Sequence, residues 1–185
     1  MLLWSPIAVA AMFALGWAVG RRSTPLDDWF HRLGRGPARW LLFFTEPWLL
    51  AVALAAAVAV ALYVRRWRLA AVMVASPLVG IALSTLFKRL FRRESGGALA
   101  YPSGHITATV IVMGMLVLVA GSAMWAVVLA ATVTLLGIVG QAVTYHYFTD
   151  TVGALLLGTA VVCVAALIVE LDRRQPECDA DHTGG

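Results

Sequence analysis

The sequence predicts an all-α integral membrane protein with six transmembrane helices, for three reasons. Of its 185 residues, 61% are hydrophobic and only 13% are charged, far outside the usual composition of a soluble domain. The mean hydropathy is +0.85. The apolar residues also gather into stretches close to the roughly 20 residues that a helix needs to cross the hydrocarbon core. The six predicted spans are residues 2–20, 46–64, 69–87, 105–121, 123–145 and 151–170.

The first apolar stretch could be read as a secretory signal, but we interpret it as a span. No basic residue precedes it, and Arg21 and Arg22 follow it, which is the reverse of a signal peptide. No internal repeat and no second domain interrupts the later spans. We therefore expect one six-span domain over residues 1–172 and a polar, disordered tail over residues 173–185.

Segment 23–45 lies between the first and second spans and mixes charges with Trp, Phe and Leu at helical spacing. This pattern predicts one or two interfacial helices in the membrane plane. At its end, Thr45-Glu46-Pro47 predicts the start of the second span, with Thr45 as N-cap and Pro47 in the first turn.

Counting spans predicts which loops share a membrane face. Loop 88–104 leaves the third span, two spans follow, and loop 146–150 leaves the fifth, so both loops emerge on one face. Segment 21–45 lies on that face as well, where it could act as a lid or admit lipid. Polar residues far apart in the sequence can therefore converge.

Tyr101-Pro102-Ser103-Gly104-His105 stands at the mouth of the fourth predicted span. The first N–H groups of a helix lack internal partners and the helix dipole favours an anion, so a phosphate fits there. Ser103 adds a hydroxyl group, and Gly104 permits close approach of the backbone. The structural alternative is an N-cap serine after a proline, but a histidine directly following at a membrane interface favours a functional site.

His146 and Asp150 are four residues apart, which places them on one face of a helix or within reach across a tight turn. A carboxylate that accepts from one imidazole nitrogen leaves the other free as nucleophile or base. Taken alone, two polar residues capping neighbouring spans explain the pattern equally well. Convergence with His105 favours catalysis.

Four cations, Lys88, Arg89, Arg92 and Arg93, end the third predicted span. The ordinary interpretation is that they anchor the span at the interface. They share a face with both histidines, however, where a phosphate needs its charge neutralised. Helical geometry prevents all four from reaching one phosphate, so we expect Lys88 with either Arg92 or Arg93.

Together these motifs resemble the type 2 phosphatidic acid phosphatase superfamily, the integral-membrane lipid phosphate phosphatases. The resemblance covers essentially the whole membrane domain. Its motifs, in chain order, are Lys88-Arg89-Leu90-Phe91, Pro102-Ser103-Gly104-His105 and His146-x3-Asp150. The resemblance implies that Lys88, Ser103 and Gly104 bind phosphate, His105 is the general acid, His146 the nucleophile and Asp150 its orienting partner.

The sequence departs from the family pattern, K-x6-R-P, P-S-G-H and S-R-x5-H-x3-D, at two arginines. Ser95 stands seven residues after Lys88, and Gly140 occupies the arginine position of the third motif. Arg93 matches an extra arginine of related sequences that run K-x4-R-x-R-P, so we expect it to compensate in part.

The resemblance implies a phosphatase for a lipid-linked phosphate, acting through a phosphohistidine without metal or cofactor. Its partners are the lipid substrate and membrane lipids, not nucleic acid; the oligomeric state is open. The resemblance offers polyprenyl diphosphates, phosphatidic acid and phosphatidylglycerol phosphate as substrates. Because the Arg- and Ala-rich chain suggests an actinobacterial source, it also offers decaprenylphosphoryl phosphoribose. We rank polyprenyl-linked substrates first. The rival class is a non-enzymatic lipid-phosphate binder or transporter, which the scarcity of ionisable residues inside the spans disfavours.

Membrane orientation has conflicting indicators. The family resemblance implies a bacterial plasma-membrane protein with both termini inside and the active site on the extracytoplasmic face. The positive-inside rule favours the reverse, because the site face carries more basic residues than the other face. The other face holds Arg65, Arg66, Arg68, Arg173 and Arg174. We expect the family orientation.

Overall fold

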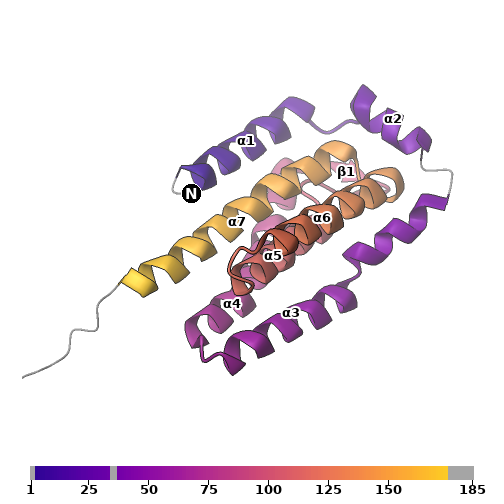
Figure 1. Cartoon of the computed structure of the whole chain (residues 1–185). Coiled ribbons are helices and arrows are strands. Elements are labelled where there is room, and N and C mark those ends of the chain that lie inside the picture. Colours follow the sequence, from indigo (N-terminus) through magenta and orange to yellow (C-terminus); the bar gives the residue numbers. More distant parts are fainter. Residues whose placement is uncertain (1–2, 34–36, 175–185) are drawn as a thin grey trace, which may run out of the picture.

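The computed structural model describes residues 3–33 and 37–174, with side chains for residues 3–33 and 40–170. Within these residues the chain is a bundle of long helices with two shorter helices and a small hairpin at one end (Figure 1). The elements are α1 (Trp4–Val19), α2 (Pro25–Leu33), the 3-10 helix η1 (Pro37–Thr45), α3 (Pro47–Tyr63), α4 (Trp67–Phe91), β1 (Glu94–Ser95), β2 (Ala98–Leu99), α5 (Gly104–Val119), α6 (Met124–Thr144) and α7 (Phe148–Arg174).

All six apolar segments expected from the sequence are helices, α1 and α3 to α7. Three of them, α4, α6 and α7, are long and apolar enough to cross a membrane, while α1, α3 and α5 are apolar but shorter. The segment expected at the interface forms two helices, α2 and η1, the second being a 3-10 helix. The disorder expected for the tail concerns residues that, from 175 onward, lie outside those described.

Helix α5 lies in the middle of the bundle, because its small and β-branched residues let four neighbours approach. A Cβ at Gly158 of α7 would lie 2.7 Å from Val110 of α5, so only a glycine permits this helix crossing. The largest apolar cluster joins α3, α4, α5 and α7 through residues such as Met73, Ile111 and Met115, each fully buried. α1 packs on the outer side of α7 (Figure 1).

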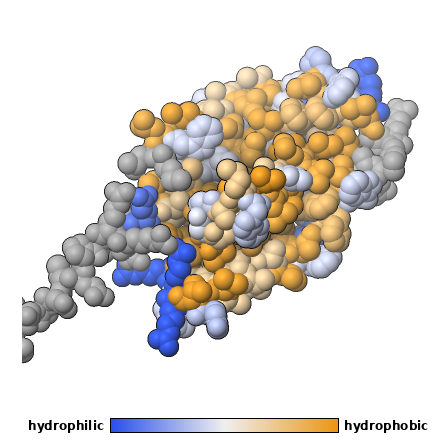
Figure 2. Space-filling view, viewed as in Figure 1, coloured by the Kyte–Doolittle hydropathy of each residue, from blue (hydrophilic) through white to orange (hydrophobic). Residues whose placement is uncertain are grey.

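The visible surface of the bundle is mostly apolar (Figure 2), and all seven tryptophans are more than one third exposed. Tryptophans gather at both membrane–water interfaces, where an amphipathic ring is stable. Their positions fit this: Trp17, Trp29, Trp40 and Trp48 lie at or near the end of the bundle that carries α2 and η1, and Trp4, Trp67 and Trp125 begin helices that start from the opposite end.

One local expectation was wrong. The N-cap of α3 is Glu46 rather than Thr45, and Pro47 opens the helix as predicted. Thr45 is instead engaged in tertiary contacts, since its hydroxyl donates to the Leu42 carbonyl and accepts from Gln141 Nε2 of α6. The buried partner on α6 therefore outweighs the local preference of threonine for the cap position.

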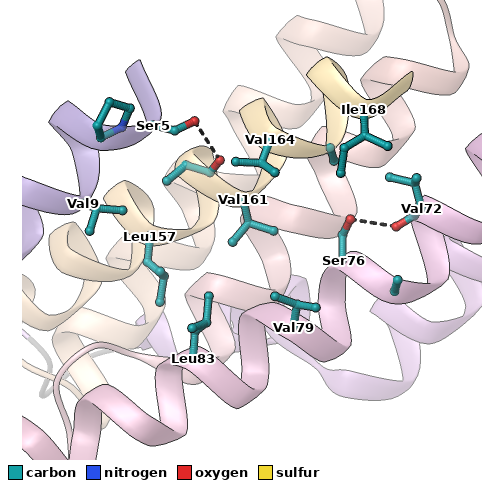
Figure 3. Close-up of a pocket in the computed structure, with 14 residues that line it drawn as sticks. Ser5, Val9, Val72, Ser76, Val79, Leu83, Leu157, Val161, Val164 and Ile168 are labelled. Atoms are coloured by element: carbon teal, nitrogen blue, oxygen red, sulfur yellow. Dashed lines mark hydrogen bonds between the residues drawn. The ribbon is translucent and has the colours of Figure 1, made fainter. Parts of the chain in front are cut away.

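A long apolar groove runs between α1, α4 and α7, away from the polar end of the bundle (Figure 3). Its two hydroxyl groups are both satisfied by backbone carbonyls, Ser5 by Ala160 and Ser76 by Val72. The remaining lining residues are aliphatic or proline, such as Val9, Leu157 and Ile168. This groove suits a hydrocarbon chain, and its two hydroxyl groups already donate to the backbone.

Candidate active site

The two loops that span counting placed on one face do meet. The Ser103 backbone N–H, at the start of α5, donates to the Asp150 carbonyl of α7 at 3.1 Å. The β1–β2 hairpin, which the sequence did not predict, closes the site from the α4 side through a hydrogen bond from Ser95 Oγ to the Tyr145 carbonyl. Gly96 and Gly97 make its turn, both at positive φ.

The two histidines lie close together, with ring centroids 6.4 Å apart. His105 is exposed in the first turn of α5, and His146 is half-buried between α6 and α7. Nδ1 of His146 faces Asp150, 3.9 Å from Oδ2, and has no hydrogen-bond partner among the described residues. Nε2 is therefore the ring nitrogen left free for chemistry, at a distance from Asp150 that modest tightening would convert into a hydrogen bond.

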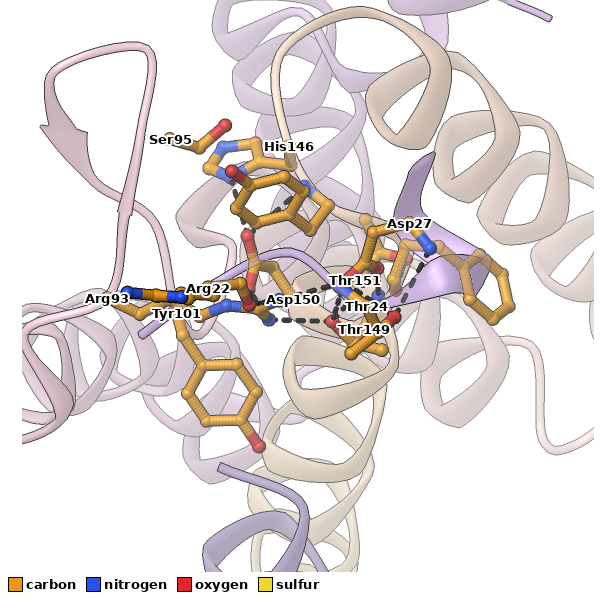
Figure 4. A network of polar contacts seen from close by, with 12 residues as sticks. Arg22, Thr24, Asp27, Arg93, Ser95, Tyr101, His146, Thr149, Asp150 and Thr151 are labelled. Atoms are coloured by element: carbon orange, nitrogen blue, oxygen red, sulfur yellow. Dashed lines mark hydrogen bonds and ion pairs between the residues drawn. The ribbon is translucent and has the colours of Figure 1, made fainter. Parts of the chain in front are cut away.

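Asp150 belongs to a buried ionic cluster, which we define as Asp27, Arg93, Thr149 and Asp150 (Figure 4). Arg93 NH1 donates to Asp150 Oδ1 at 2.7 Å, and Arg93 NH2 donates to Asp27 Oδ2 at 2.8 Å. Thr149 Oγ1 accepts from Arg93 NH1 and donates to Asp27 Oδ1. The side chains of both carboxylates and of Arg93 have no exposure to solvent.

Asp27 enters the cluster from α2, where it also begins the helix. The Thr24 N–H donates to its carboxylate and the Asp27 N–H donates to Thr24 Oγ1, a reciprocal capping box. Burial alone would raise the pKa of Asp27, but hydrogen bonds from Thr149, Thr24 and Arg93 outweigh it and lower the pKa below its usual value. Asp27 is thus a carboxylate held in its charged form.

Lys88 lies over the N-terminus of α5. A Cβ at Gly104 would be 3.9 Å from Lys88 Nζ and 3.7 Å from Ser84 Oγ, so the ammonium group stands directly beside the unpaired N–H groups of the first turn. Ser103 is the N-cap, yet its hydroxyl makes no capping bond and is buried with no hydrogen-bond partner among the described residues. An ammonium group, free N–H groups and an unsatisfied hydroxyl together suit a phosphate.

Lys88, Gly104 and His105 form the polar end of a cavity of about 440 Å³ between α3, α4 and α5, which we call the site cavity. The rest of its wall is largely aliphatic. The lining residues are Thr45, Pro47, Leu50, Ala51, Leu54, Pro77, Ile81, Ser84, Thr85, Lys88, Gly104, His105, Ala108 and Val112. A phosphate carrying an apolar chain matches both parts of this wall.

His146 lines a different, more polar hollow of about 370 Å³. Ser95, Thr144 and His31 also border it, and His31 Nε2 lies 3.3 Å from the His146 carbonyl. The two histidines, whose rings are tilted by 58° to each other, therefore border different hollows, one largely apolar and one more polar.

No family model matches the chain, and no curated protein matches it. Among solved structures it is similar to the crystal structure of a transmembrane PAP2-type phosphatidylglycerolphosphate phosphatase from Bacillus subtilis. The TM-score is 0.79 and the sequence identity is 15%, over 94% of this chain and 100% of that one. The chain has the PAP2-type phosphatase fold. This confirms the fold implied by the three motifs.

At the two positions where this chain lacks an arginine of the PAP2-type pattern, the residues present make packing or hydrogen-bond contacts. At position 140, a Cβ on the glycine would lie 2.9 Å from the Leu41 backbone carbon, because η1 packs directly on α6 there. At position 95, the serine side chain ties the hairpin to Tyr145. The space that an arginine would need at position 140 is filled by main chain.

The two candidate phosphate-binding arginines lie in different settings. Arg92 ends α4 in the left-handed conformation and is exposed. Arg93 is buried, and both of its terminal nitrogens are occupied by the ionic cluster and by the Arg22 carbonyl. Its guanidinium also covers the Tyr147 ring at 4.5 Å. Arg93 therefore faces carboxylates, not the site cavity.

Sequence reasoning missed Asp27, Thr149 and His31. The stretch Thr24-Pro25-Leu26-Asp27 carries a capping-box signature that indicates a helix start. Nothing in the sequence points from that start to Arg93, 66 residues away.

Proposed function

We propose that the chain is a membrane-embedded phosphatase that hydrolyses a lipid-linked phosphate or diphosphate through a phosphohistidine. One observation carries the proposal: the rings of His105 and His146 lie 6.4 Å apart, and His105 shares the largely apolar site cavity with Lys88. A hydrocarbon chain in that cavity brings a phosphate headgroup to the cation and the histidines. The PAP2-type fold supports the same reaction class.

The first step transfers the phosphoryl group to His146. Lys88, the N–H groups at the mouth of α5 and the Ser103 hydroxyl hold the phosphoryl oxygens, with Gly104 allowing close approach. His146 Nε2 forms a bond to phosphorus while the bond to the leaving oxygen breaks. His105 donates a proton to that oxygen, so a neutral lipid alcohol or a lipid monophosphate leaves.

The second step releases the phosphate. His105, now neutral, accepts a proton from a water molecule whose oxygen attacks phosphorus. The phosphorus–nitrogen bond breaks and its electron pair returns to the His146 ring. Asp150 stabilises the positive charge that develops on that ring in both steps. The chemistry we propose uses no metal and no cofactor.

In the membrane we propose six spans, α1 and α3 to α7, with α2 and η1 at the interface. The protein then belongs to the bacterial plasma membrane, with the site on the extracytoplasmic face. Single cysteines placed at exposed positions of α2, in a variant without Cys163 and Cys178, would test this. Labelling of intact cells by a membrane-impermeant reagent supports this orientation, and protection of these cysteines contradicts it.

For the substrate we propose polyprenyl-linked phosphates first. The alternatives are phosphatidic acid and phosphatidylglycerol phosphate, of which the second has a specific observation in its favour, since the similar structure is titled a phosphatidylglycerolphosphate phosphatase. A non-enzymatic lipid-phosphate binder with this fold has no use for a histidine oriented by a carboxylate.

The test is phosphate release in detergent from polyprenyl diphosphate, phosphatidic acid and phosphatidylglycerol phosphate. The wild-type protein should release phosphate from at least one of them, and His146→Ala should abolish the release. His182→Ala, which removes a histidine beyond the described residues, is the matched control. Equal turnover by the wild-type protein and His146→Ala would refute the proposed mechanism.

A further inference from the structure

Asp27 is a buried carboxylate for which the proposed reaction has no use, although Arg93 bridges it to the orienting Asp150. Its side chain has no solvent exposure. It accepts hydrogen bonds from the Thr149 N–H at 3.0 Å, from Thr24 Oγ1 at 2.9 Å and from Arg93 NH2 at 2.8 Å. A capping box alone requires only the first turn of α2 and does not explain the contacts to α7 and to Arg93.

The charges of the cluster show what Asp27 adds. Arg93 is the one cation within it, and it stands between two carboxylates, with NH2 on Asp27 and NH1 on Asp150. With Asp150 alone, the guanidinium would pair fully and leave a neutral ion pair beside His146. With both carboxylates, the cluster carries a net charge of −1. That charge favours the positive His146 ring that forms during phosphoryl transfer.

The same contacts fix the direction of Asp150. Because the guanidinium is planar and rigid, holding its NH2 on Asp27 determines where NH1 points, and NH1 holds Oδ1 of Asp150. The other oxygen, Oδ2, is thereby turned toward His146 Nδ1, where it also accepts from the Tyr147 N–H.

We infer that Asp27 is a positioning residue for the hydrolysis. It engages Arg93 so that Asp150 keeps both its charge and its orientation toward His146, and it withholds Arg93 from the substrate phosphate. This inference rests on the proposed function and assigns Arg93 to Asp150 instead of to the phosphate.

The experiment compares Asp27→Asn with Asp28→Asn in the full-length protein in detergent, using whichever lipid phosphate the wild-type protein hydrolyses. Asp28 is the matched control, because it is the next residue of α2 and is exposed. We expect Asp27→Asn to lower kcat about 10- to 100-fold, by analogy with the loss of an outer-shell partner that orients a metal ligand. KM should stay within about twofold, since Asp27 does not contact substrate. Asp28→Asn should behave as the wild-type protein.

Two results would overturn the inference: kcat of Asp27→Asn equal to that of Asp28→Asn, or a changed KM with an unchanged kcat, which would mean that Arg93 binds the substrate phosphate. If Asp27→Asn does not fold, Thr24→Val replaces it, since it removes one donor to Asp27 and keeps the charge. A smaller loss of kcat at constant KM then supports the inference, and unchanged kinetics overturn it. Failure of the proposed function is recognised separately, by equal rates of wild-type protein and His146→Ala.

Discussion

The two halves of the site are built in opposite ways. On the α2 and α7 side, the ionic cluster is fully buried and its carboxylate oxygens and the terminal nitrogens of Arg93 are hydrogen-bonded. On the α4 and α5 side, Lys88 and His105 border an open cavity, and the Ser103 hydroxyl has no hydrogen-bond partner within the described part of the chain. A buried charge is stable only when paired, whereas a group that must bind substrate has to stay unpaired. The first half is therefore suited to holding the structure, which we call the holding half, and the second to binding substrate, which we call the reacting half.

Removing His105 tests the reacting half most severely. We expect His105→Ala to lower kcat about 10²- to 10⁴-fold, the range for loss of a general acid or base, with little change in thermal stability because the side chain is exposed. Phosphate release and thermal unfolding in detergent measure the two effects. If His105→Ala instead lowered the unfolding free energy by as much as it raised the activation free energy, the two halves would not differ in this way.

Removing Arg93 tests the holding half. Arg93→Ala leaves two carboxylates buried without a cation, which typically costs about 3–5 kcal/mol of unfolding free energy. Arg92→Ala, at the exposed neighbour, should cost almost nothing. Thermal unfolding of both variants gives the comparison, and equal midpoints would show that the cluster does not contribute to stability.

Lys88→Met removes the cation of the site cavity and keeps the length of the side chain. We expect kcat/KM to fall roughly 10- to 100-fold, because a hydrogen bond to a charged group contributes about 1.5–3 kcal/mol. Arg89→Met, at the exposed neighbour on α4, should leave kcat/KM unchanged. If both variants have the same activity, Lys88 acts as a membrane anchor only.

Gly140→Ala probes the contact that replaces an arginine. The new Cβ would meet the Leu41 backbone at 2.9 Å, so η1 must shift, and overpacking of this kind costs about 1–3 kcal/mol. We expect a lower midpoint of thermal unfolding for Gly140→Ala than for Val139→Ala, a control at the adjacent exposed residue. Unchanged stability would mean that η1 moves away freely.

The smallest effect is the pH dependence of the cluster. The folded-state pKa of Asp27 is lowered, so its stabilising contribution is present above the unfolded pKa of about 3.9 and is lost as pH falls through the folded pKa. The difference in thermal midpoint between wild-type protein and Asp27→Asn should therefore shrink as the pH drops below about 4. A constant difference down to pH 3 would show that charge is not involved.

Much of this architecture could be predicted, because apolar stretches in the sequence indicate the long helices. The number of spans between two loops then predicts whether the loops lie on the same face. His105 and His146 were found in this way. The ionic cluster could not be predicted, because the pairing of Asp27 with Arg93 depends on how α2 folds back over α7. The partners of Arg93 could not be predicted for the same reason. Its spacing from Lys88 suggested a phosphate ligand, whereas in the structure it pairs with two carboxylates.

The lengths of the helices have a consequence for the surrounding lipid. α3 has 17 residues and α5 has 16, which at about 1.5 Å per residue gives roughly 25 Å, less than the approximately 30 Å of a typical hydrocarbon core. If both helices cross the bilayer as proposed, we expect the membrane to thin around them, which is one of the ways in which a short span is accommodated. These two helices border the site cavity, so hydrophobic mismatch would bring lipid headgroups toward Lys88. Bilayer thickness then becomes a variable that sets how readily substrate reaches the enzyme.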